Sequence, residues 1–331
     1  MPAAVRKIEM DKSPEKINLL ITGAAGNLGG LLAEHIRNDS SISLSLMIHD
    51  KNAGESLRND PRIKIFRADL ADSDTLLPVL DGIDVVVHFA GVLFRHNPEK
   101  FLPVTNLQYF KNLLDSSLER GVRRMILISF PHVEGETFHD APARGSLDGR
   151  PDSVHASTRL EEEKYLFSRG NDGFEPVSLR AGMVYGKGIL MIDAAKRLMR
   201  HGLLGIWRKP TWIHLVSIDD FLSSVKNASV RPGIKGIYHI GDEGVQTLQE
   251  FLDSMAVHWG FKKPVRMPVF LIRAAACFCE IFSMIFGTRS PLTRDFIKIG
   301  MASYYGDTSR MRNELLEELK YKNYKDGLPI L

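Results

Sequence analysis

Short apolar runs alternate with segments of helical spacing through most of the chain. The apolar runs predict strands at 17–21, 43–49, 63–66, 84–90, 124–129, 176–180 and 236–240. Apolar positions spaced three and four residues apart predict helices at 28–36, 72–80, 107–120, 189–201, 247–259 and 311–319. Such alternation is typical of a parallel sheet with helices on both faces. We therefore expect an α/β fold with a doubly wound parallel sheet.

A glycine-rich turn follows the first predicted strand. Gly23 would permit the tight turn, Gly26 a close approach of backbone to a phosphate, and Gly29 close packing of helix on strand. The helix that begins here points its positive N-terminus at the turn, which suits a pyrophosphate. Asp50 ends the next apolar run 21 residues after Gly29, close to the spacing of a carboxylate that binds a ribose 2′-hydroxyl. This combination predicts dinucleotide binding; the alternative is an ordinary glycine-rich turn of an α/β protein.

Composition narrows the classes of partner. The chain has 331 residues, of which 44% are apolar and 25% charged, as in soluble globular proteins. Its net charge of +3 includes no block of like charge, so we expect no nucleic-acid partner. Cys277 and Cys279 stand two residues apart, and we interpret them as buried small apolar residues. We expect neither a metal site nor a disulfide, and a cytoplasmic location.

Two segments bear on membrane contact. Residues 1–16 are polar and charged, which predicts a flexible tail rather than a signal peptide. Residues 268–286 are apolar apart from Arg273 and Glu280, which interrupt the roughly 20 apolar residues that a membrane span needs. We expect no transmembrane segment and interpret 268–286 as a helix packed over a substrate cavity. Peripheral membrane contact is the alternative.

Seven motifs follow one another in a fixed order along nearly the whole chain. They are 22–29 (TGAAGNLG), 68–70 (ADL), 87–91 (VHFAG), 106–108 (NLQ), 179–186 (LRAGMVYG), 214–220 (HLVSIDD) and 237–241 (IYHIG). In these motifs the chain resembles the extended short-chain dehydrogenase/reductases, which include nucleotide-sugar epimerases and dehydratases, dihydroflavonol reductases and 3β-hydroxysteroid dehydrogenases. The resemblance implies a Rossmann-type sheet, a smaller and mostly helical C-terminal lobe, and an NAD cofactor.

The resemblance also implies which residues hold the cofactor. Phosphates would lie at the glycine turn, the adenine beside 69–70, and the nicotinamide along the end of the fourth strand. The expected contacts are Gly23, Ala25, Gly26, Asn27, Leu28, Gly29, Asp50, Lys51, Asp69, Leu70, Phe89, Ala90, Gly91, Asn106 and Arg159. Asp50 favours NAD because its carboxylate would meet a 2′-phosphate, whereas the adjacent Lys51 leaves room for NADP.

The chain departs from the family at the catalytic centre. The family's Tyr-x-x-x-Lys pair works from one helix face, where Tyr exchanges the substrate proton and Lys lowers the pKa of that Tyr. The register set by 163–166 (EKYL) places His155 at the Tyr position and Arg159 at the Lys position. The register of the fifth strand puts Phe130 where the family has its catalytic hydroxyl, and an offset of one residue makes Ser129 the candidate.

Two interpretations of His155 and Arg159 stay open. In the first, His155 is a substitute general acid/base, kept neutral by its positive neighbour, and Arg159 holds charge near the nicotinamide ribose. This predicts an NAD(P)-dependent oxidoreductase or epimerase/dehydratase with a non-standard active site. In the second, both residues lie on a helix surface near a cofactor retained for structure or sensing. This predicts an inactive dinucleotide-binding structural or redox-sensing protein.

Three further residues are candidates for contact with a small-molecule substrate. His132 would lie close to His155, although a loop histidine is commonly solvent-exposed. Tyr185 either contacts substrate or shapes a turn. His214 either faces the cleft or is structural at a strand edge.

The domain organisation follows from the order of these motifs. We expect a dinucleotide-binding domain of residues 17–182 and 211–243 and a substrate lobe of residues 183–210 and 244–331, with the ligand between them. Family members often form dimers, so a homodimer is a further expectation by analogy.

Overall fold

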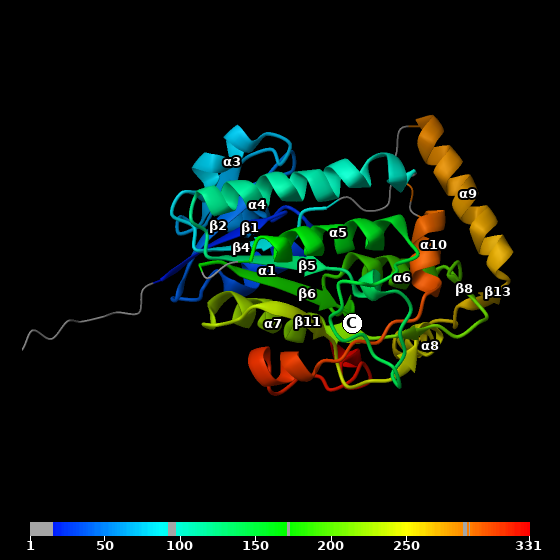
Figure 1. The fold of residues 1–331 in the computed structure, drawn as a ribbon. Coiled ribbons are helices and arrows are strands. Elements are labelled where there is room, and N and C mark those ends of the chain that lie inside the picture. The colour runs from blue at the N-terminus through cyan, green and yellow to red at the C-terminus, as the bar shows by residue number, and fades with distance from the viewer. Residues whose placement is uncertain (1–15, 92–96, 171–172, 287–289, 291) are drawn as a thin grey trace, which may run out of the picture.

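Seven parallel strands form the central sheet (Figure 1). The computed structural model describes residues 16–91, 97–170, 173–286, 290 and 292–331, so the predicted tail lies outside the described residues except for Lys16. The strands are β1 (Ile17–Thr22), β2 (Ile42–Ile48), β3 (Lys64–Arg67), β4 (Val85–His88), β5 (Arg124–Ser129), β6 (Glu175–Ala181) and β11 (Gly236–Ile240). Their spatial order is β11-β6-β5-β4-β1-β2-β3, so the chain winds outward in both directions from β1. The predicted doubly wound fold is confirmed.

Helices cover both faces of the sheet (Figure 1). On one face lie α3 (Ser73–Leu80), α4 (Tyr109–Glu119) and α5 (Val154–Ser168); on the other, α1 (Asn27–Ile36) packs against α7 (Ile218–Val230). Alternate residues of one strand enter opposite cores, since Leu20 packs with Phe110 of α4 and Leu19 belongs to the core of Phe221 in α7. Burial on both faces explains the uninterrupted apolar runs of the strands.

The strand register aligns the carboxyl ends of the central strands. Thr22 at the end of β1 pairs with Met47 of β2 on one side and with His88 of β4 on the other. The connections after β1, β2 and β4 therefore leave the sheet along one edge, which is where a doubly wound sheet binds its ligands.

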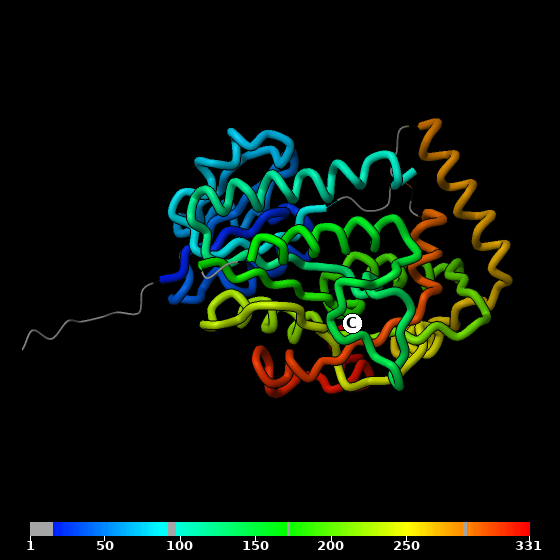
Figure 2. The backbone as a smooth tube through the Cα atoms, in the orientation of Figure 1, coloured from blue at the N-terminus to red at the C-terminus, as the bar shows by residue number. Residues whose placement is uncertain are grey.

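Besides the short α2 (Glu55–Arg58) between β2 and β3, the remaining described residues form three small two-stranded sheets and four α-helices. The strand pairs are β7 (Met183–Tyr185) with β10 (Leu215–Ser217), β8 (Gly205–Trp207) with β13 (Val265–Met267), and β9 (Trp212–Ile213) with β12 (Gln246–Thr247). The helices are α6 (Leu190–Arg200), α8 (Leu248–His258), α9 (Val269–Phe286) and α10 (Arg294–Met301). The C-terminal residues return to the sheet, because η4 (Met311–Leu315) contacts β11 and α7 (Figure 2).

The expectation that Cys277 and Cys279 are buried is wrong. Most side chains of α9, the helix that carries them, are exposed. Cys277 and Cys279 on α9 are free thiols and only partly buried. The helical pattern is present, but hydropathy alone did not indicate which way it faces.

Candidate functional site

The glycine turn between β1 and α1 is as tight as the sequence predicts. Gly23 has a φ of +72°, and a Cβ built on it would lie 2.8 Å from the backbone nitrogen of Ala90. A Cβ on Gly29 would lie 2.6 Å from the carbonyl oxygen of Gly23, and one on Gly26 would lie 3.0 Å from the same oxygen. Each contact is closer than real Cβ atoms tolerate with ease, so the turn needs glycine at all three positions.

The N-terminus of α1 opens toward this turn. Its N-cap is the exposed Gly26, so no side chain of the cap residue covers the helix end. The side chain of Asn27 holds the connection after β7, because its Nδ2 donates to the Gly188 carbonyl at 2.7 Å and its Oδ1 accepts from the Leu190 amide at 3.1 Å. The helix end thus combines a positive dipole with an accessible backbone, a geometry that suits a phosphate.

Two carboxylates lie together beyond β2 and β3. Asp50 has a side chain that is 87% exposed, and its carboxylate lies 3.2 Å from Nδ1 of His49. Nε2 of the same imidazole lies 3.6 Å from the carboxylate of Asp69. His49 therefore bridges the two acidic residues that the sequence motifs singled out, a role that their spacing does not reveal. Lys51 is exposed beside them.

Arg159 reaches from α5 to the end of β4. Its Nη2 lies 3.5 Å from the carbonyl oxygen of Ala90, and a Cβ on Gly91 would lie 2.6 Å from the same nitrogen. Asn106 is buried next to this position, with its Oδ1 3.9 Å from the Cβ position of Gly91. The structure thus brings together the residues predicted for the nicotinamide end of the cofactor.

Glu162, which the sequence analysis missed, pairs with Arg159. Its Oε2 lies 2.5 Å from Nη1 of Arg159, both side chains are buried, and its Oε1 makes no hydrogen bond to any described residue. Burial raises the pKa of Glu162 to about 7, although the charge of Arg159 opposes the shift. The spacing of three residues on one helix was the available signal.

His155 lies in the first turn of α5, where Ser153 caps the helix by accepting a hydrogen bond from the Ala156 amide at 3.1 Å. The imidazole is buried and meets the ring of Phe130 edge-on at a centroid distance of 4.9 Å. Burial, and secondarily the charge of Arg159, lower the pKa of His155 to about 3. The shift has the direction expected from the sequence, with burial as the larger cause.

Ser129 and Phe130 point into different surroundings. The Ser129 hydroxyl donates to the buried carboxylate of Glu163. Phe130 instead lies between two imidazoles, with its ring centroid 5.2 Å from that of His132 and 4.9 Å from that of His155. Phe130 therefore lies beside His155, as the strand register indicates. Ser129 is hydrogen-bonded to Glu163 and does not face His155.

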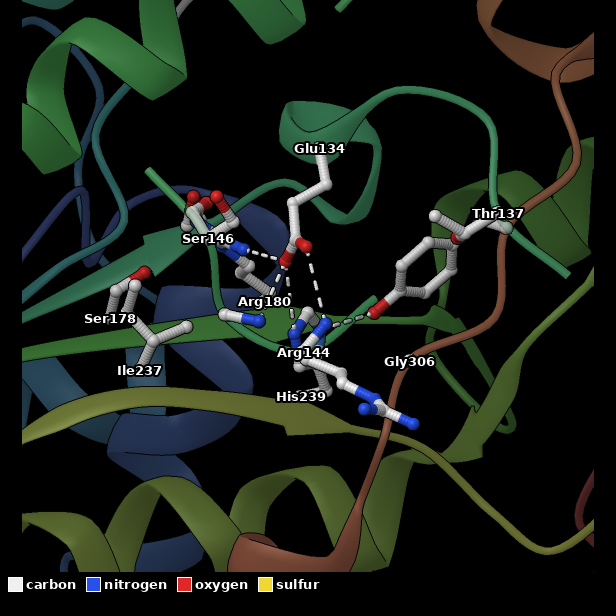
Figure 3. Close-up of polar contacts among 12 residues, drawn as sticks. Glu134, Thr137, Arg144, Ser146, Ser178, Arg180, Ile237, His239 and Gly306 are labelled. Atoms are coloured by element: carbon white, nitrogen blue, oxygen red, sulfur yellow. Dashed lines mark hydrogen bonds and ion pairs between the residues drawn. The ribbon is translucent and has the colours of Figure 1, made fainter. Parts of the chain in front are cut away.

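The carboxylate that holds Ser129 belongs to a buried ionic cluster. Glu163 accepts hydrogen bonds from the Ser178 hydroxyl at 2.8 Å and from Nε of Arg180 at 3.0 Å. Arg180 also donates to Glu134, which lies 3.3 Å from Nε2 of His239 (Figure 3). Burial opposes ionisation of Glu134, but the contacts with His239 and Arg180 prevail and lower its pKa to about 2.

This cluster positions the loop that carries Phe130 and His132. Glu134 extends from η3 (Pro131–Glu134) in that loop, Arg180 from β6 and His239 from β11, and the three converge in Figure 3. Losing one partner would leave a buried charge uncompensated, which is costly. The cluster therefore fixes the loop relative to the sheet.

The three substrate candidates differ in their surroundings. His132 is half-buried, its Nε2 lies 3.0 Å from the Ala302 carbonyl, and it lines a hollow with Glu136, Asp152, Ser153 and Lys298. Burial lowers the pKa of His132, and its Nδ1 makes no hydrogen bond to a described residue. His132 thus faces a hollow.

His214 and Tyr185 have structural partners instead. Nε2 of His214 lies 2.7 Å from the Asp242 carbonyl, and its Nδ1 accepts from the Gly306 amide at 3.2 Å, so both ring nitrogens are engaged. Tyr185 is fully buried against Phe251, at a ring-centroid distance of 5.8 Å. Among the described residues, no group of three His, Cys, Asp or Glu side chains is placed to hold a metal ion.

The sequence is similar to a known protein family and to characterised enzymes. A family model described as the NAD dependent epimerase/dehydratase family matches residues 19–208. Uronate dehydrogenase of Pseudomonas putida is 29% identical over 167 residues, which are 50% of this chain and 60% of that protein. The chain thus spans about six tenths of the length of this curated relative.

Solved structures share the fold over almost the whole chain. UDP-glucuronic acid 4-epimerase of Bacillus cereus, in complex with UDP-glucuronic acid and NAD, is 19% identical with a TM-score of 0.73, covering 95% of this chain and 97% of that chain. A human epimerase family protein with NADPH is 15% identical with a TM-score of 0.75, covering 95% and 99%. At these identities the likeness shows the fold alone.

Proposed function

Because the chain belongs to the NAD dependent epimerase/dehydratase family, we propose that it binds NAD and transfers a hydride between the nicotinamide and a hydroxyl or carbonyl substrate. The observation that carries the proposal is the glycine turn. A Cβ on Gly23 or Gly29 would clash with backbone atoms at 2.8 or 2.6 Å, and one on Gly26 would lie 3.0 Å from a carbonyl oxygen, so glycine lets the backbone turn tightly beside the uncapped N-terminus of α1. A diphosphate fits this arrangement of backbone and dipole.

The other residues proposed to contact the cofactor lie along the same edge of the sheet. Asp50 would bind the adenine ribose, Asp69 and Leu70 would lie beside the adenine, and the 89–91 segment would run along the nicotinamide half. The pair of carboxylates bridged by His49 supports NAD over NADP, because a 2′-phosphate would meet two negative charges. When bound, NAD supplies the hydride chemistry, and the chain supplies position and charge.

His155 is the proposed acceptor of the substrate hydroxyl proton. Its imidazole is neutral near pH 7, so it can accept a hydrogen bond from a hydroxyl without first losing a proton. The low pKa makes it a weak base, so the proton would move only as hydride leaves the substrate carbon. Arg159, paired with Glu162, would hold the nicotinamide end in place.

The names of the relatives suggest where to look for a substrate. One is a uronate dehydrogenase, and one structural neighbour was solved with UDP-glucuronic acid. We propose a sugar acid or a nucleotide sugar as the first substrate class to test.

A second candidate function is a dinucleotide-binding protein without turnover. The observation that favours it is the packing of His155 against Phe130, which puts an apolar ring where the family has a hydroxyl. In this case the cofactor would serve structure or redox sensing.

Turnover assays separate the two candidates. The purified full chain is mixed with NAD and a panel of uronates, UDP-sugars, alcohols and ketones while nicotinamide absorbance is followed. If the first proposal holds, His155→Phe lowers the rate at least about a hundredfold, as loss of a general base does. Its NAD affinity stays within about threefold, and the matched control His201→Phe, at an exposed position on the C-terminal side of α6, leaves both unchanged.

Two other outcomes would count against the first candidate. NAD binding by the unaltered chain without turnover of any panel compound would favour the second candidate. Absence of NAD binding would reject both.

A further inference from the structure

Helix α9 has its polar and apolar faces reversed with respect to an ordinary surface helix. Its buried residues are Ile272, Ala276, Glu280 and Ser283, which form one narrow stripe facing α10 and β8. Its outer face is apolar, with Phe270, Phe278, Ile281, Met284, Ile285 and Phe286 between 47% and 69% exposed. A surface helix of a soluble protein normally buries its apolar stripe and exposes its charges. We call these six side chains the α9 surface.

The helix is tied to the body of the protein at its start and in its C-terminal half. In that half, Glu280 accepts a hydrogen bond from the backbone amide of Arg294 at 2.7 Å, and its other oxygen lies 2.7 Å from Nε of that residue. At its start, β13 pairs with β8. Figure 1 shows α9 along the outer edge of the molecule, beside α10. Because the buried stripe is held in this way, α9 lies along the protein body.

Basic residues gather at the start of α9. Lys262 and Lys263 precede β13, and the pairing of Met267 with Trp207 brings Arg208 and Lys209 next to the helix start. All four of these lysine and arginine residues are exposed, as is Arg273 on α9 itself. Asp253 lies 3.8 Å from Lys263, so an acidic residue is present at one side of the cluster. Positive charge nevertheless prevails there, although the whole chain carries only +3.

The only acidic residue of α9 turns away from this surface. Glu280 is buried and paired with Arg294, so the outward face of the helix presents apolar side chains and the cation of Arg273. An apolar face bordered by cations matches the chemistry of an anionic membrane surface, in which acyl chains lie under negative headgroups.

We propose that the α9 surface docks on an anionic lipid membrane, with α9 lying in the plane of the interface. Among the described residues α9 is also long and apolar enough to cross a bilayer, but crossing would pull its buried stripe from α10 and β8. A two-fold interface with a second copy would bring like surfaces together. An anionic membrane would also neutralise the basic cluster, whereas a second copy carries the same cluster and the same net positive charge.

Vesicle co-sedimentation of the purified full chain tests this proposal. Vesicles of phosphatidylcholine are compared with vesicles that contain phosphatidylglycerol, at low and high salt. We expect binding to the anionic vesicles that weakens as salt rises. Phe278→Ser and Ile285→Ser should each weaken binding about tenfold, the loss expected for one large apolar side chain no longer inserted. Lys262→Glu should weaken it about fivefold or more.

The matched control is Val245→Ser, which removes a residue that is 45% exposed outside the α9 surface and should bind vesicles like the unaltered chain. Thermal melting and NAD titration of every variant show whether it is folded. Failure to bind any vesicle overturns the proposal. So does a soluble dimer that Phe278→Ser dissociates, which would assign the α9 surface to a second copy. Binding that resists alkaline extraction would assign α9 to a transmembrane orientation instead and also overturn in-plane docking.

Discussion

Replacing Gly23 by alanine tests whether the glycine turn is built as the structure has it. Two separate costs arise at this position. The φ of +72° is a conformation that alanine disfavours, by roughly 1 kcal/mol. The new Cβ would also lie 2.8 Å from the nitrogen and 3.0 Å from the Cα of Ala90, both of which are backbone atoms that cannot rotate away.

A matched variant separates the two costs. Gly82 has a φ of +70° and nothing within 4 Å of its Cβ position, so Gly82→Ala incurs only the conformational penalty of about 1 kcal/mol. Gly23→Ala adds the clash with the end of β4, which corresponds to overpacking and costs about 1–3 kcal/mol more. Because the turn and β4 must move apart, we expect NAD affinity to fall at least about tenfold in Gly23→Ala and to stay unchanged in Gly82→Ala.

Thermal unfolding and calorimetric titration with NAD measure these effects. Each kcal/mol should lower the melting temperature by about 1–3 °C in a chain of this size. The reasoning is refuted if Gly23→Ala melts together with Gly82→Ala, or if it binds NAD as tightly as the unaltered chain.

Three further predictions concern charge. Asp50→Ala removes a carboxylate from the ribose position while Lys51 remains, so the affinity for NADP relative to NAD should rise about tenfold in fluorescence titrations; an unchanged ratio would count against this assignment. Burial raises the pKa of Glu162 to about 7 from its ordinary 4.5, so its stabilising contribution is complete below pH 4.5 and is lost as the pH rises through 7. Relative to Glu162→Gln, the unaltered chain should therefore lose on the order of 1–3 kcal/mol over that interval in urea unfolding, and parallel pH profiles would contradict the burial of this carboxyl. Arg180→Met leaves buried carboxylates without a cation and should cost about 3–5 kcal/mol in the same assay, whereas a loss below about 1 kcal/mol would show that the cluster is not tightly coupled.

The sheet was predictable from the sequence because its strands are buried on both faces. The predicted strands 124–129 and 236–240 coincide with β5 and β11, where apolar runs end at polar or glycine residues. Helices α7 and α10 were not predicted. Each begins at a hydroxyl N-cap, Ser217 or Thr293, whose oxygen accepts an amide of the first turn, so capping was a usable signal.

The candidate site was predictable only where it depends on local sequence. The glycine turn joins two consecutive elements, and His155 and Arg159 lie on one helix. Both features depend on residues that are close in sequence, and both are present as expected. The bridge from His49 to Asp69 joins residues that follow β2 and β3, and its formation depends on how those strands pair. The exposure of the apolar face of α9 could not be predicted from the sequence either, because an apolar pattern predicts a helix but does not indicate which residues pack against it.

A crystal structure of the protein grown with NAD tests the central claim most directly. The account predicts that the diphosphate lies within hydrogen-bonding distance of backbone amides in the Gly23–Gly29 turn at the start of α1. The nicotinamide should lie beside Gly91 and Arg159. Diphosphate density at any other place, or none at this turn under saturating NAD, would contradict it.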